Sequence, residues 1–225
     1  MKTPIILKKS VLFRVSKRQK FIISVIILSL LLFLSEYLFG RSGIYTIITV
    51  AALTDILLFW AIKNDLKDKS SLQIFILPFF YTLSFGLFYF LVPARFLTRI
   101  AMTTFYALGI YSLFLSQNIF VVSAVRTIAL LSSARTVSFI ITLVSYFFLS
   151  NVTFSLHLNV FITLLLIFAF SFPLILQCIW TYTLEKGFLV SVLWSGVLSI
   201  SLVEVSLILW FFPTTPTILA LYNKH

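Results

Sequence analysis

Seven long apolar runs, separated by short polar connections, constrain the fold of this chain more than any other feature. A membrane-spanning helix needs about 20 apolar residues to cross a hydrocarbon layer ~30 Å thick. It also satisfies its backbone hydrogen bonds internally, which a lipid environment requires. The runs are 17 to 23 residues long and occupy positions 21–39, 44–62, 71–92, 100–116, 137–155, 159–177 and 188–210. The sequence therefore predicts an all-α, polytopic transmembrane helix bundle of about seven spans.

The composition excludes most other classes of protein. Hydrophobic residues make up 61% of the chain and charged residues only 10%, whereas soluble domains carry about 25% charged residues. The polar side chains are too few to cover a water-facing surface, which excludes an ordinary soluble enzyme and a disordered chain. One cysteine, Cys178, excludes an internal disulfide framework.

The segment 117–136 does not fit the simple count of spans. It is apolar, but Arg126 lies in its middle and Arg135 near its end. An arginine at the centre of a bilayer costs at least ~2.5 kcal/mol on insertion scales. We interpret the segment as an interfacial helix whose two arginines reach lipid headgroups. An eighth span is the alternative.

The distribution of basic residues predicts the orientation of the bundle. Seven of the 17 Lys and Arg residues precede the first apolar run. With seven spans and the N-terminus inside, 13 basic residues lie inside and four outside, in agreement with the positive-inside rule. An eighth span gives 11 and five and leaves Arg126 within the bilayer. We therefore expect a basic cytoplasmic segment over 1–20, the bundle over 21–213 and a short tail over 214–225. The net charge of +11 then reflects membrane orientation, and no nucleic-acid partner is expected.

The sequence contains none of the common catalytic or cofactor-binding motifs. Its six glycines do not have the spacing of a phosphate-binding loop. Its two histidines cannot supply a third nitrogen ligand for zinc, and no nucleophile-elbow motif is present. We expect no cofactor and no metal, and the chain is more typical of a non-enzymatic protein.

Three carboxylates within the apolar runs are the candidate functional residues. Asp55 lies near the middle of the second run, Glu204 in the outer half of the seventh, and Glu36 in the outer half of the first. Ionisable groups in spans are costly and by default indicate a functional site. A protonated carboxyl can instead bond to hydroxyls of neighbouring helices and hold the bundle together. Both interpretations stay open for Asp55, while the position of Glu36 near the membrane surface favours a structural role.

Helical phase predicts how two of these carboxylates are oriented. Glu204 points about 180° away from Ser195 at 100° per residue. The last run therefore has a polar point on one side and, on the other, a packing seam of small residues that consists of Ser191, Ser195, Ser199 and Ser206. Asp55 shares its face with Ala51 and Ala52, so we expect it to point at a closely packed neighbour.

These observations lead to three functional hypotheses. The first is a non-enzymatic membrane-embedded subunit or accessory protein that packs against lipids, other membrane proteins or a second copy of itself. The alternative is a small proton- or cation-coupled transporter that uses Asp55 and Glu204. A second alternative is a lipid-linked sugar enzyme that uses Glu36. In each case we expect an integral membrane protein, and the plasma membrane of a bacterium is the expected location.

Overall fold

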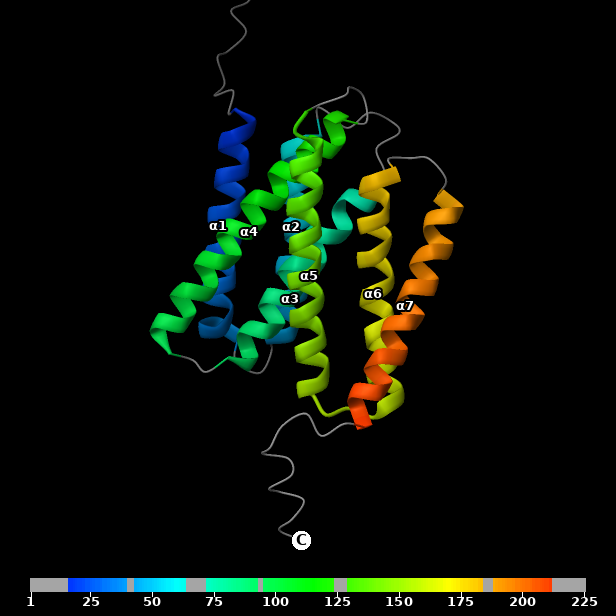
Figure 1. Cartoon of the computed structure of the whole chain (residues 1–225). Helices are drawn as coiled ribbons and strands as arrows, with labels where there is room; N and C mark the ends of the chain where they lie inside the picture. Colours follow the sequence, from blue (N-terminus) through cyan, green and yellow to red (C-terminus); the bar gives the residue numbers. More distant parts are fainter. Residues whose placement is uncertain are drawn as a thin grey trace, which may run out of the picture.

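The computed structural model describes residues 16–39, 43–63, 72–92, 95–123, 129–183 and 188–211, and within these ranges every regular element is helical. Figure 1 shows the helices as one bundle, in which some helices stand upright in the view and others cross it obliquely. In chain order they are α1 (Lys17–Phe39), α2 (Gly43–Ile62), the short 3₁₀ helix η2 (Leu72–Phe75), α3 (Ile76–Leu91), α4 (Phe96–Ser123), α5 (Leu131–Ser155), α6 (Val160–Thr183) and α7 (Phe188–Phe211).

Seven helices in the described part of the chain are long and apolar enough to cross a membrane, which agrees with the predicted all-α bundle. The third of them becomes long enough because η2 leads directly into α3. Successive helices run in opposite directions (Figure 1). We call the end at which α1 begins the basic end, because Lys17, Lys63 and Arg135 lie there on α1, after α2 and on α5.

The structure divides the segment 117–136 between two long helices, where the sequence predicted a separate interfacial helix or an eighth span. Residues 117–123 continue α4, and residues 131–136 form the first turns of α5. The physical reason is burial: Gln117 and Phe120 extend the buried face of α4 that includes Leu113, so packing against the bundle continues past the end of the predicted span. Arg126 lies outside the described residues.

Helix α3 is the central element of the bundle. It packs against α2, α4, α5 and α6, whereas α1 packs against α2 and α4. Rings supply much of this core: Phe85 and Phe88 of α3 both contact Phe148 of α5, with centroids 4.8 and 4.2 Å apart. Helix α7 packs against α6 and lies at the edge of the bundle, at the right of Figure 1.

Candidate functional site

Asp55 lies at the edge of the buried face of α2. Its side chain is half-buried, and its Oδ1 atom is enclosed without a hydrogen-bond partner. Of the two alanines predicted to share a face with Asp55, Ala51 is buried and Ala52 is exposed. Asp55 therefore lies at the boundary between the buried and the exposed side of α2. Phe59, one turn further along, contacts Phe75 of η2. This side of α2 therefore faces η2 and the beginning of α3.

A chain of three buried hydroxyls begins at Thr54, the residue before Asp55, and joins α2, α3 and α4. Thr54 Oγ1 lies 3.0 Å from Thr82 Oγ1, which lies 3.0 Å from the hydroxyl of Tyr106. None of the three side chains is exposed. Because Thr54 donates its proton to the carbonyl of Val50 at 2.9 Å, it accepts from Thr82, and Thr82 accepts from Tyr106. Sequence reasoning did not identify this chain, because no local pattern relates residues 28 and 24 positions apart.

Tyr81 holds the Tyr106 end of the hydroxyl chain in place. The two rings stack with centroids 5.7 Å apart. The hydroxyl of Tyr81 donates to the carbonyls of Phe105 and Tyr106, at 3.3 and 3.4 Å. This approach requires a glycine at position 109, because a Cβ there would collide with the Tyr81 hydroxyl. Helix α4 is therefore fixed against α3 at this depth.

Glu204 lies on the opposite side of α7 from its packing seam, as helical phase predicts. The seam is confirmed by burial, since Ser191, Ser195, Ser199 and Ser206 are each at most 4% exposed. Glu204 is exposed. Helix α7 packs against α6, whereas the helix that carries Asp55 packs against α1 and α3. The structure therefore does not bring Asp55 and Glu204 together.

The exposed side of α7 carries a continuous stripe with alternating spacings of four and three residues. We call it the α7 stripe; all of its members are exposed, and they are Val190, Trp194, Val197, Ser201, Glu204, Ile208 and Phe211. This is the spacing with which one helix contacts another along a coiled-coil seam. Ser201 and Glu204 are its polar members, and Glu204 is the one ionisable residue in α7. The polar pair thus lies within an otherwise apolar contact surface.

Arg135 binds the last turn of α6. Its Nε donates to the carbonyl of Thr181 at 2.9 Å, and an Nη donates to the carbonyl of Tyr182 at 3.4 Å. The guanidinium also lies 5.3 Å from the centroid of the Tyr182 ring. The carbonyls at the end of a helix lack partners within the helix and carry partial negative charge, so Arg135 is a cap for α6. Its predicted contact with lipid headgroups stays a prediction.

Two of the predicted site residues fall outside the description. Arg126 is not among the described residues. Glu36 belongs to α1, but its side chain is not described. Within the described ranges, no group of three or more His, Cys, Asp or Glu side chains is placed to hold a metal ion.

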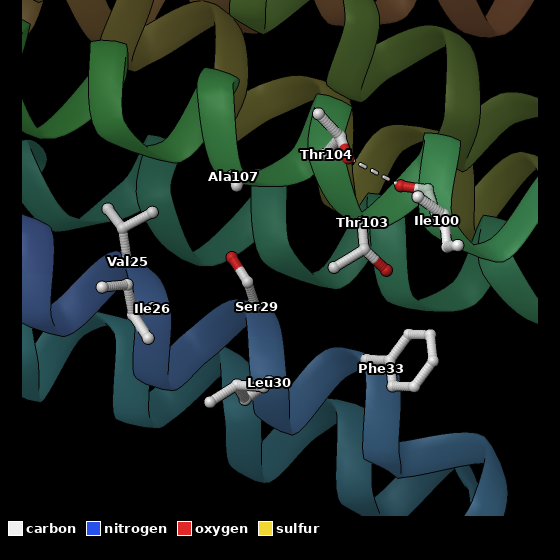
Figure 2. Close-up of a pocket in the computed structure, with 9 residues that line it drawn as sticks. All are labelled: Val25, Ile26, Ser29, Leu30, Phe33, Ile100, Thr103, Thr104 and Ala107. Carbon is white, nitrogen blue, oxygen red and sulfur yellow. Dashed lines mark hydrogen bonds between the residues drawn. The ribbon is translucent and has the colours of Figure 1, made fainter.

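Two of the grooves between the described helices have apolar walls. The first, with a volume of about 370 Å³, lies between parts of α1 and α4. Figure 2 shows Ser29 of α1 and Thr103 of α4 on its facing walls, and both hydroxyl oxygens are buried without hydrogen-bond partners. The second, of about 620 Å³, lies between α3, α4 and α5, with Tyr81, Phe85 and Ser112 among its lining residues. Grooves of this size and polarity can accommodate an apolar chain.

No protein-family model, curated protein or solved structure matches this chain.

Proposed function

We propose that the protein is a non-enzymatic membrane-embedded subunit that assembles with a second copy of itself through the α7 stripe. The observation that carries this proposal is the exposed position of Glu204 beside Ser201. Glu204 precedes the end of α7 by seven residues, or about 10 Å of helix, so in a membrane it faces hydrocarbon. A charged Asp, Lys or Arg at the centre of a span costs roughly 2.5–3.5 kcal/mol on insertion scales, and a glutamate that faces lipid two turns from a helix end carries a cost of the same kind. A partner helix that covers the stripe removes this cost.

A second copy is a suitable partner because the α7 stripe is complementary to itself. A two-fold axis parallel to α7 places each stripe against its own equivalent. A protonated Glu204 then donates to Ser201 or Glu204 of the second copy, and the hydroxyl of Ser201 supplies an acceptor. Hydrogen bonds between membrane helices contribute about 0.6–2 kcal/mol each. The apolar members of the stripe supply the remaining contact.

The proposed orientation places the basic end on the cytoplasmic side. Among the described residues, Lys17, Arg18, Lys20, Lys63 and Arg135 lie at the basic end, and Arg95 and Arg99 lie at the opposite end. The positive-inside rule favours this orientation. The bacterial plasma membrane stays a prediction from the sequence.

Cysteine cross-linking in lipid vesicles tests the assembly. In a Cys178→Ser background, Val197→Cys places a thiol on the α7 stripe, and Leu198→Cys places one on the same helix outside it. Both parent side chains are similarly exposed, at 54% and 45%. We expect oxidation to give a covalent dimer at position 197 and little at 198. Equal cross-linking at both positions, or a monomer by photobleaching of the unmodified protein in vesicles, would contradict the proposal and would indicate a different partner.

Transport is the second candidate function, and the environment of Asp55 favours it. The enclosed, unpaired Oδ1 atom lies one residue from Thr54, the first member of the hydroxyl chain. Since Glu204 lies on a helix that does not pack against α2, a transporter would use Asp55 without it. Proton flux into vesicles that is abolished in stable Asp55→Asn protein would support transport, whereas unchanged flux would leave Asp55 a structural residue. The sugar-enzyme hypothesis rests on Glu36 and stays a prediction.

A further inference from the structure

Two glutamine side chains in the core lack hydrogen bonds altogether. Gln117 of α4 and Gln177 of α6 are both 0% exposed. The amide oxygen and the amide nitrogen of each have no partner. Gln73 of η2 is 6% exposed, and its Oε1 is also unpaired. A carboxamide has two donors and an acceptor with two lone pairs, and burying these groups unpaired is costly. Unlike a serine or threonine hydroxyl, the longer glutamine side chain is poorly placed to bond back to its own helix.

The two amides of α4 and α6 lie at the same depth in the bundle. Phe120 and Trp180 contact each other edge to face, with centroids 6.4 Å apart. Gln117 and Gln177 each precede one of these rings by three residues, or nearly one turn. Because α4 and α6 run in the same direction (Figure 1), one turn back from the ring contact brings both glutamines to one level.

Gln73 reaches a similar depth from a third element. Helix η2 packs against both α3 and α6. Thr82 of α3 contacts Tyr106 of α4, and the two helices run in opposite directions. Gln73 lies nine residues before Thr82, and Gln117 lies eleven after Tyr106. Measured along each helix from the contact between Thr82 and Tyr106, Gln73 and Gln117 both lie about 15–17 Å towards the basic end, once the longer rise of the 3₁₀ turn is included. The two glutamines are therefore at a similar depth.

We propose that Gln73, Gln117 and Gln177 form an internal binding site for a small uncharged hydrogen-bonding molecule, of which water is the smallest example. The three carboxamides offer both donors and acceptors, which suits a neutral guest. None of the three carries a charge to compensate an ion. The nearest described cation along α5 and α6, Arg135, is bound to the carbonyls of α6 and would repel a cationic guest.

The contact between Phe120 and Trp180 closes this site towards the basic end. Both rings follow the glutamines in the direction of that end. They are 0% and 5% exposed, respectively. A guest that enters from the basic end must therefore displace this aromatic pair.

Radiolytic footprinting with water as the probe tests the site. Hydroxyl radicals formed from bound water label neighbouring rings even where bulk solvent has no access. Phe170 of α6 is the control, because it is only 6% exposed, contacts Tyr146 and lies seven residues, or about 10 Å of helix, before Gln177. In native protein in lipid nanodiscs, we expect Phe120 and Trp180 to be labelled several-fold more than Phe170. Labelling of Phe120 no greater than that of Phe170 would overturn the proposal.

A double-mutant cycle provides an independent measurement. Gln117→Met and Gln177→Met keep the shape of the side chain and remove its polar atoms. If a guest bridges the amides, each single variant lowers the melting temperature, and the double variant lowers it by less than the sum. If the amides are only unpaired groups, each single variant raises the melting temperature, which would contradict the proposal. Where a variant does not fold, the footprinting of the native protein decides.

Discussion

Arg135 Nε donates to the carbonyl of Thr181 at 2.9 Å and so joins the second turn of α5 to the last turn of α6. Helix α7, which carries the α7 stripe, packs against α6. By holding the end of α6, Arg135 therefore also helps to fix the position of α7. A residue predicted to interact with lipid thus has a defined contact with protein.

Replacing Arg135 should destabilise the α5–α6 pair. Arg135→Met keeps part of the aliphatic stem and removes both hydrogen bonds to the carbonyls. Hydrogen bonds to charged groups contribute about 1.5–3 kcal/mol, and partial exposure of Arg135 reduces this to about 1–2 kcal/mol. Arg135→Lys should restore part of the loss, because it keeps the charge near the helix end. Thermal unfolding in detergent measures both variants, and equal stability of Met and native protein would contradict the cap.

The direction of the hydroxyl chain predicts unequal effects at its members. Tyr106→Phe removes the first donor and leaves Thr82 with its bond to Thr54, so it should cost about 0.5–1.5 kcal/mol. Thr82→Val keeps the shape of the side chain but leaves the buried hydroxyl of Tyr106 without an acceptor, which should cost about 1–3 kcal/mol. Chemical unfolding of both variants tests the order. A larger loss for Tyr106→Phe would mean that the chain donates in the other direction.

Two glycines provide a matched test of close packing. Gly109→Ala places a Cβ against the hydroxyl of Tyr81, so the ring contact between α3 and α4 must shift. We expect a loss of about 1–3 kcal/mol, the usual range for overpacking. A Cβ at Gly196 of α7 has nothing within 4 Å, so Gly196→Ala should be neutral or stabilising by about 0.5–1 kcal/mol. The difference between their melting temperatures is the measurement, and similar values would refute the close approach.

The polar pair of the α7 stripe should control dimerisation. Glu204→Leu removes the hydrogen bonds across the proposed two-fold axis, whereas Glu204→Gln keeps a donor and an acceptor. At a contribution of about 0.6–2 kcal/mol per bond, the Leu variant should weaken dimerisation by roughly three- to 30-fold for each bond lost. Photobleaching at varied protein density in vesicles gives the dissociation constants. Unchanged dimerisation in the Leu variant would show that Glu204 does not contribute.

Reporter fusions test the orientation. A reporter attached after Lys63, at the basic end, should signal a cytoplasmic location. One attached after Leu156, at the opposite end, should signal the outer side. Reversed signals at both positions would invert the bundle and contradict the positive-inside assignment.

The sequence alone determined the class of fold, because each helix is specified by a contiguous apolar run whose length matches a membrane. It also determined the two sides of α7, since helical phase separates Ser195 from Glu204 without reference to any other helix. The ends of α4 and α5 escaped prediction, because Arg126 and Arg135 suggested a surface helix while the burial of Gln117 and Phe120 depended on their neighbours. The relationships that only the tertiary structure decided are those between distant positions: Thr54 with Thr82 and Tyr106, Phe120 with Trp180, and Arg135 with Thr181. Hydropathy is a local property of the chain, whereas the partner of a buried polar group depends on which helices pack together and at what rotation. In an apolar bundle many such arrangements bury similar area, so the few polar contacts that distinguish them are visible only after packing.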